Sequence, residues 1–77
     1  MLEILAKDKD SYVRASVTKN PNTSKEIQEF LTKDEDWEVR ECVAQNLNVS
    51  KEILKILAKD KDLYVCKFVS LTYLNDI

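Results

Sequence analysis

The feature that most constrains this chain is an internal repeat of 26 residues. Residues 5–30 read LAKDKDSYVRASVTKNPNTSKEIQEF and residues 31–56 read LTKDEDWEVRECVAQNLNVSKEILKI, so that about half of the aligned positions are identical. A third copy begins at Leu57 and follows the first closely through Val69. Self-similarity at a fixed period is typical of proteins built from stacked structural units. We therefore expect a single domain, residues 1–77, with units at approximately 1–30, 31–56 and 57–77.

Each unit contains two segments whose apolar residues recur at i, i+3 and i+4, which predicts amphipathic helices. The first segment covers residues 25–32, 51–58 and, truncated, 1–6; its apolar positions are Ile27, Phe30 and Leu31, with Ile53, Ile56 and Leu57 as equivalents. The second covers residues 37–45, 11–19 and 63–71; its apolar positions in the middle unit are Val39, Cys42 and Val43. Helices shorter than about 12–15 residues are marginal alone. The sequence therefore predicts an all-α fold, a short α-solenoid of about three helix–turn–helix repeats sharing one core.

Polar residues mark the ends of these helices. Thr23 and Glu26 have the spacing of a capping box for the helix at residue 25, and Ser50 or Asn48 can cap its equivalent. Asp10, Asp36 and Asp62 each precede a second helix, where a carboxylate accepts free backbone N–H groups. The chain has no glycine. Asn20 and Asn46 are therefore predicted to end their helices in the left-handed conformation that asparagine tolerates.

The repeated acidic turns invite a calcium interpretation, but such loops need more oxygen ligands and a glycine for the sharp turn. Helix capping explains these aspartates better. Arg14 and Arg40 lie four residues after Asp10 and Asp36. We predict that they form structural ion pairs, either within the helix or with the aspartates of a neighbouring unit; the alternative is binding of an acidic ligand.

Composition excludes most catalytic designs. The absence of glycine excludes Gly-rich phosphate loops, and the absence of histidine excludes Ser/His/Asp and Cys/His nucleophile pairs. Cys42 and Cys66 form no CxxC pair and supply two ligands where an iron–sulfur cluster usually needs four. Cys42 lies on an apolar stripe and is expected to be a small buried hydrophobe, whereas Cys66 is expected to be more exposed. We predict no enzyme activity, no catalytic residue, no cofactor and no metal.

The charge of the chain and its targeting signals indicate which classes of partner and which location to expect. Twelve Lys and Arg against 14 Asp and Glu give a net charge of −2, which disfavours nucleic-acid binding. The alternative is kept open by one row of equivalent lysines, Lys7, Lys33 and Lys59, each followed by an aspartate. The chain shows neither a signal peptide nor an apolar run long enough to span a membrane. A cytoplasmic location with reduced cysteines is expected.

Residues 20–46 resemble the leucine-rich repeat variant, a family of helical repeats. The resemblance is carried by an N-P-x-T turn, a leucine before the acidic turn, and D-x-D-x-x-V-R with a following valine; the matching residues are Asn20, Pro21, Thr23, Leu31, Asp34, Asp36, Val39, Arg40 and Val43. The sequence departs from the family pattern at Leu47, Val49 and Cys66. The resemblance implies an α-helix and a shorter, often 3₁₀, helix in each repeat, stacked as a right-handed superhelix. HEAT-like repeats, whose period is usually longer, are the second choice.

Three aromatic residues are candidate partner-binding residues because the units tolerate other residues at their positions. Trp37 corresponds to Ser11 and Leu63, and both Tyr12 and Tyr64 correspond to Glu38. Large amphipathic side chains are typical interface anchors, although packing over the helix turn is the alternative. Tyr73 is a fourth candidate, in the apolar C-terminal segment with Leu71 and Leu74, which either folds back or self-associates. We expect a non-catalytic scaffold for protein–protein interaction.

Overall fold

The fold consists of helices only. A computed structural model describes residues 2–46 and 48–74, and this part contains no strand. Its elements are six α-helices and a π-helical turn: α1 (Leu2–Leu5), α2 (Ser11–Thr18), α3 (Lys25–Thr32), α4 (Trp37–Gln45), α5 (Lys51–Leu57), α6 (Leu63–Val69) and η1 (Ser70–Leu74). The all-α prediction is confirmed, and α3 and α4 have the predicted bounds. The other four helices end one or two residues earlier than predicted.

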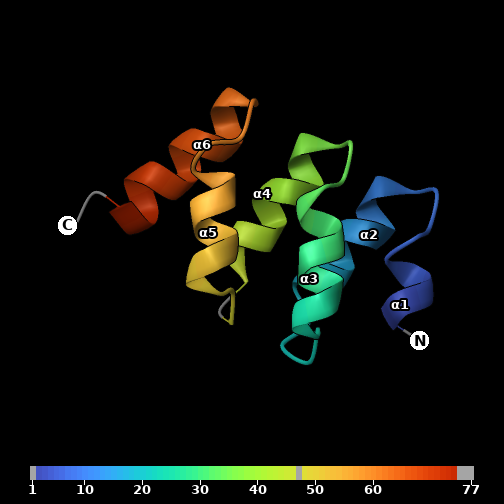
Figure 1. The fold of residues 1–77 in the computed structure, drawn as a ribbon. Coiled ribbons are helices and arrows are strands. Elements are labelled where there is room, and N and C mark those ends of the chain that lie inside the picture. Colours follow the sequence, from blue (N-terminus) through green and yellow to red (C-terminus); the bar gives the residue numbers. More distant parts are fainter. Residues whose placement is uncertain (1, 47, 75–77) are drawn as a thin grey trace.

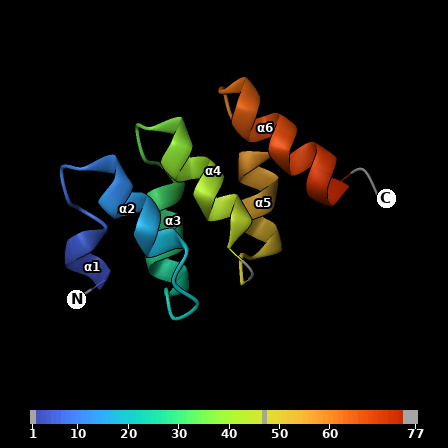
Figure 2. The same ribbon diagram turned by 180° about the vertical axis from the view of Figure 1, so that it is seen from behind.

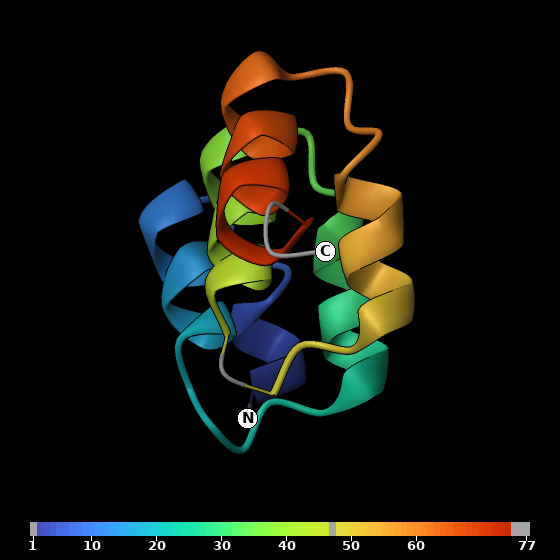
Figure 3. The same cartoon turned by 90° about the vertical axis from the view of Figure 1, so that its left-hand side faces the viewer.

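The helices form two layers. Helices α2, α4 and α6 lie side by side, and α3 and α5 pack against them from one side, which is seen from the front and from behind (Figures 1 and 2). Helix α1 packs on α2 at the N-terminal end. The view along the long axis separates the two layers (Figure 3). The resulting domain is compact, with principal dimensions of 37 × 22 × 14 Å.

The core lies between the two layers. Ile27, Leu31, Val39 and Val43 are buried as predicted, together with the equivalents Ile53, Leu57, Val65 and Val69. Phe30 and Ile56 were predicted to join them, and this prediction is wrong, because both side chains are at least half exposed. Helices α3 and α5 are covered from one side only, so the i+3 member of each apolar stripe, Phe30 or Ile56, faces outward.

Side chains cap the helices largely as expected. Ser50 Oγ accepts the Ile53 N–H at the start of α5, and Asp10 and Asp62 accept the N–H groups of Tyr12 and Tyr64. The prediction for α3 is wrong by one residue. Ser24 Oγ accepts the Ile27 N–H, while Thr23 is buried and its hydroxyl donates to the Val17 carbonyl.

The two turn asparagines act differently from the prediction. No residue in the described ranges 2–46 and 48–74 has a positive φ, so the prediction that Asn20 and Asn46 end their helices in the left-handed conformation is wrong. Asn20 Oδ1 instead accepts the Asn22 N–H at 2.8 Å, and Asn46 Oδ1 accepts the Asn48 N–H at 2.7 Å. Such Asx turns end a helix without glycine, because the side chain replaces a backbone acceptor. Asn46 Nδ2 also donates to the Thr18 carbonyl, which joins the two turns.

Candidate interaction surface

Arg14 joins the first unit to the second, and we call this contact the first junction. Its Nε donates to Asp34 Oδ2 at 2.8 Å and its Nη2 to Asp34 Oδ1 at 3.2 Å, a bidentate pair. Nη2 also donates to Asp36 Oδ2 at 2.6 Å. Nη1 donates to the carbonyls of Asp8 and Lys9 at 2.7 and 3.0 Å. The hydrogen bond to Asp34 and the negative charges of Asp34, Asp36 and Glu35 raise the pKa of Arg14 above its ordinary value, against the opposing effect of burial.

Arg40 joins the second unit to the third in the second junction. Its Nε and Nη2 donate to Asp60 at 2.8 and 3.1 Å, and Nη1 donates to the Asp34 carbonyl at 2.6 Å. Both arginines are buried, and their carboxylate partners belong to the following unit. The predicted structural pairing with a neighbouring unit is therefore confirmed, whereas residues 2–46 and 48–74 show no pair of Arg14 with Asp10 or of Arg40 with Asp36. An acidic ligand would have to displace these bonds, which makes the arginines poor binding residues.

The polar side chains of the core are satisfied. Every buried side-chain nitrogen or oxygen in residues 2–46 and 48–74 has a hydrogen-bond partner. Within the same ranges, no group of three or more His, Cys, Asp and Glu side chains is placed to hold a metal ion. Both cysteines are free and partly buried, and burial raises the pKa of the Cys42 thiol. A thiol with a raised pKa is a poor nucleophile at neutral pH.

Two of the candidate aromatic residues meet at one end of the α4/α6 pair. Trp37 begins α4 and Tyr64 lies in the first turn of α6, and their rings stack with centroids 5.1 Å apart. Trp37 is 37% exposed and Tyr64 65%. Tyr12 occupies the same helical position on α2 as Tyr64 on α6, and it is 77% exposed. We call Tyr12, Trp37 and Tyr64 the aromatic surface.

Tyr73 lies elsewhere. It belongs to η1, at the far end of the rod that α6 and η1 form together (Figure 2). Its hydroxyl donates to the Ala44 carbonyl at 2.7 Å, and its ring meets Phe68 edge-on with centroids 6.4 Å apart. The structure thus gives Tyr73 a packing role between η1 and α4, whereas Trp37 and Tyr64 stack on each other.

Acidic groups accompany the aromatic surface. Glu41 lies one turn after Trp37 on α4, and partial burial raises the pKa of its carboxyl group. The negative charges of Asp62 and Glu38 raise it further. A surface that combines exposed aromatic rings with carboxylates suits a partner with cationic side chains, because the ring face and the carboxylate both attract positive charge.

A second surface, on α1, α3 and α5, was missed by the sequence analysis. Ile4, Phe30 and Ile56 lie 26 residues apart and are exposed by 73%, 50% and 59%. We call these three residues the apolar ridge. The signal was present in the sequence, because the three residues occupy equivalent positions. The stripe pattern alone does not show which of its members faces water.

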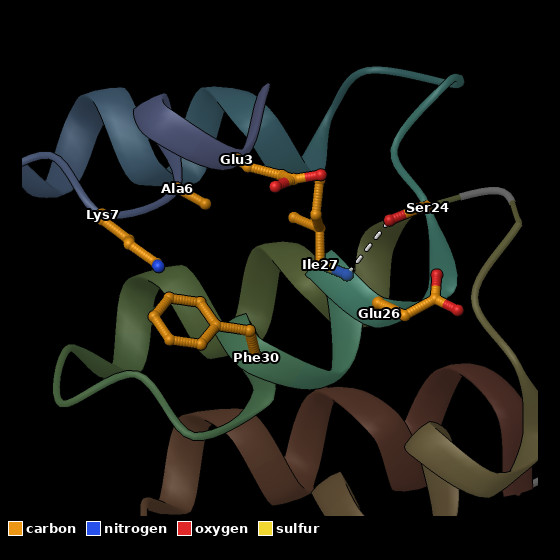
Figure 4. Close-up of a pocket in the computed structure, with 7 residues that line it drawn as sticks. All are labelled: Glu3, Ala6, Lys7, Ser24, Glu26, Ile27 and Phe30. Atoms are coloured by element: carbon orange, nitrogen blue, oxygen red, sulfur yellow. Dashed lines mark hydrogen bonds between the residues drawn. The ribbon is translucent and has the colours of Figure 1, made fainter. Parts of the chain in front are cut away.

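A groove with a volume of about 460 Å³ lies between α1 and α3, and Phe30 of the apolar ridge is one of its lining residues. Figure 4 shows Lys7 and Phe30 at one end of this groove and Glu3, Glu26 and Ser24 towards the other. The Lys7 Nζ lies 5.8 Å from the centroid of the Phe30 ring. Ile27 lies between these two ends (Figure 4).

The groove between α3 and α5 repeats this lining. Its volume is about 350 Å³. Each lining residue of the first groove has an equivalent 26 positions later in the second: Glu29, Thr32, Lys33, Ser50, Glu52, Ile53 and Ile56. Lys25 is added to this set. The two grooves are thus lined by residues at equivalent positions of the sequence repeat.

Comparison with models of known protein families, with curated proteins and with solved structures finds no match for this chain. No helix in the described part, residues 2–46 and 48–74, is long and apolar enough to cross a membrane. The function therefore has to be argued from the geometry of the chain itself.

Proposed function

We propose that this chain is a non-catalytic scaffold for protein–protein interaction, built as a short right-handed α-solenoid that is similar to the leucine-rich repeat variant. The supporting observation for the solenoid is that one contact recurs at the repeat spacing. Arg14 pairs with Asp34, and 26 residues later Arg40 pairs with Asp60. Repeat architectures stack units through such nearest-neighbour contacts.

The observation that carries the binding role is the aromatic surface. Its three side chains are exposed beside a fully packed core, although the units accept serine, leucine or glutamate at the same positions. Exposed Trp and Tyr residues are enriched among residues that dominate binding energy. With the nearby carboxylates of Glu38, Glu41 and Asp62, the surface suits a protein segment that carries lysine or arginine.

Nucleic-acid binding is the second candidate, and one observation favours it. Asp34 and Asp60 are paired with Arg14 and Arg40, so they neutralise the adjacent Lys33 and Lys59 less than their sequence positions suggest. A row of lysines facing outward attracts phosphate groups. The net charge of −2 remains the argument against this function.

Self-association through the C-terminal end is a further candidate contact. Leu71 on η1 is 68% exposed, whereas Tyr73 is held by Ala44 and Phe68. Leu71 is thus an exposed apolar side chain of η1 that is available to a second molecule.

The test is affinity capture with the immobilised 77-residue chain and a surface variant, Tyr12→Ser/Trp37→Ser/Tyr64→Ser, from an extract of cells that make the protein. We expect proteins that the parent chain retains and the variant loses. The matched control, Ile4→Ser/Phe30→Ser/Ile56→Ser, removes three comparably exposed apolar side chains from the other surface and should retain the same partners other than further copies of this chain.

Titration of a captured and purified partner then gives a direct signal, because Trp37 is the only tryptophan. Its emission should shift on binding. Equal capture by the parent chain and the surface variant would contradict the proposal. Capture that disappears after nuclease treatment, and labelled oligonucleotides that bind with a steep salt dependence, would support the nucleic-acid alternative instead.

A further inference from the structure

The outer face of α1, α3 and α5 carries a charge pattern around the apolar ridge. A lysine follows each ridge residue by three positions: Lys7, Lys33 and Lys59. Glutamates precede the ridge by one or four positions: Glu3, Glu26, Glu29 and Glu52. The glutamates belong to the helices, at or before the level of the ridge residue, whereas each lysine lies in the turn just after its helix, where its backbone N–H donates to the carbonyl of the ridge residue at 3.1–3.2 Å. The ridge is therefore flanked by lysines on one side and by glutamates on the other.

These charges are available to a second molecule. The ion pairs within the described ranges 2–46 and 48–74 involve Arg14 and Arg40, and none involves a glutamate of this face. The seven charged side chains are all exposed. Figure 4 shows the arrangement around Phe30, with Lys7 over the ring and Glu3 and Glu26 towards the N-terminal end of α3.

We propose that this face binds a second copy of the same chain, related by a two-fold axis that runs parallel to the apolar ridge. Such an axis keeps the ridges of the two copies together and turns each lysine row over the glutamates of the other copy. A two-fold axis in the same plane but perpendicular to the ridge would place lysine against lysine. An interface of this kind is isologous, which means that one patch serves both partners.

The charge pattern selects a second copy over an unrelated partner, because the face is complementary to itself. Lys55 stands on α5 where α1 and α3 carry Glu3 and Glu29, so the complementarity is strongest at α1 and α3. A stable interface needs roughly 800 Å² from each partner. That is about one seventh of the accessible surface of 5445 Å², a share that one outer face of a two-layer molecule can supply.

This inference goes beyond the proposed function, because it concerns α1, α3 and α5 and leaves the aromatic surface free. Sedimentation equilibrium of the 77-residue chain, from micromolar to millimolar concentration, measures the association. We expect the weight-average mass to rise from the monomer mass of 9.0 kDa towards twice that value. A mass that stays at the monomer value throughout overturns the proposal.

Two charge-reversed variants make the test specific. Lys7→Glu/Lys33→Glu reverses the lysine row, and Glu26→Lys/Glu29→Lys reverses the glutamates. Each variant alone should associate at least ten-fold more weakly than the parent chain. An equimolar mixture of the two should recover association, because the reversed rows again face opposite charges. A mixture that stays monomeric, or single variants that dimerise like the parent chain, would overturn the proposal.

Two controls separate this face from others. Lys19→Glu/Lys67→Glu makes the same change in net charge as Lys7→Glu/Lys33→Glu, at the C-cap of α2 and on α6, and should leave the dimer unchanged. Leu71→Ser removes the exposed leucine of η1 and should also leave it unchanged. Loss of the dimer in either control assigns the contact to another surface. All of the substituted side chains are exposed, so the far-UV circular dichroism should be unchanged in every variant.

Discussion

The two junctions are built from equivalent residues, yet they are not equivalent. Arg14 donates five hydrogen bonds, of which three go to carboxylates. Arg40 donates three, of which two go to carboxylates. The additional carboxylate at the first junction is Asp36, which Arg14 reaches at 2.6 Å. Its equivalent Asp62 instead caps α6 through the N–H groups of Tyr64 and Val65.

The difference shows that one sequence position has two competing uses. Asp36 makes no side-chain cap on α4, whereas Asp10 and Asp62 cap their helices. A cap contributes about 1 kcal/mol, and a hydrogen bond to a charged group contributes about 1.5–3 kcal/mol. Where the arginine reaches the aspartate, the ion pair therefore prevails over the cap. The first junction should accordingly be the stronger one.

Removing either arginine has the largest expected effect. Arg14→Ala leaves the nearly buried Asp34 without its partner, and breaking a buried ion pair costs about 3–5 kcal/mol. Arg40→Ala should cost less, about 2–3 kcal/mol, because fewer bonds are lost. Urea unfolding followed by circular dichroism measures both values.

Arg14→Lys and Arg40→Lys keep this comparison measurable if the alanine variants do not fold. Lysine retains the charge but cannot form the bidentate pair. Each lysine variant should lose less free energy of unfolding than the corresponding alanine variant. The loss should again be larger at Arg14 than at Arg40. Equal losses at the two junctions would show that Asp36 adds nothing to the first one.

Replacing the two competing aspartates has a smaller effect. Asp36→Asn removes a charged acceptor from Arg14 and should cost about 1 kcal/mol, since half of this side chain is in water. Asp62→Asn should change the free energy of unfolding by less than about 0.5 kcal/mol, because asparagine caps helices as well as aspartate does. A double-mutant cycle with Arg40→Lys should show no coupling to position 62, while the cycle of Arg14→Lys with Asp36→Asn should show coupling.

The smallest expected effect on stability comes from replacing Glu41, whose carboxyl group is repelled by the negative charge of Asp62. Burial, Asp62 and Glu38 raise the pKa of Glu41, so the folded state favours its protonated form. This contribution to stability is present below the ordinary glutamate pKa of about 4.3, and it is lost as the pH rises through the raised folded value. Glu41→Gln should therefore stabilise the chain at pH 7, by less than about 0.5 kcal/mol, and the gain should vanish near pH 3.

Asp62→Asn provides the control for this pH dependence. It removes one of the charges that raise the pKa of Glu41, so the gain from Glu41→Gln at pH 7 should shrink in its presence. Urea midpoints of the single and double variants between pH 3 and pH 7 give the comparison. A gain that is independent of pH would contradict the assignment to Glu41 ionisation.

Local features of the fold were predictable from the sequence. The i, i+3, i+4 pattern placed α3 and α4 within their observed bounds and identified Ile27, Leu31, Val39 and Val43 as core residues. Of the two predicted pairings of the arginines, the one between units is observed, and the one within a helix is not found in the described part of the chain, residues 2–46 and 48–74. These features depend on positions within one helix or on the repeat itself, and both are visible in a single chain.

Features that depend on neighbouring elements were not predictable. Phe30 and Ile56 face outward because no further layer covers α3 and α5, which the stripe pattern does not reveal. Thr23 lost its predicted capping role because its hydroxyl reaches the Val17 carbonyl of the previous helix. The stacking of Trp37 on Tyr64 joins residues 27 positions apart, one more than the repeat, so the alignment of units did not pair them.

The central claim is that consecutive helix pairs are joined by Arg14 and Arg40 through aspartates of the following unit. Because the chain contains only two arginines, nuclear magnetic resonance gives one Nε–H signal for each. The account predicts slow exchange with water for both signals, with cross-relaxation from Arg14 Hε to Asp34 and from Arg40 Hε to Asp60. Rapid exchange of both signals, with no contact to either aspartate, would contradict it.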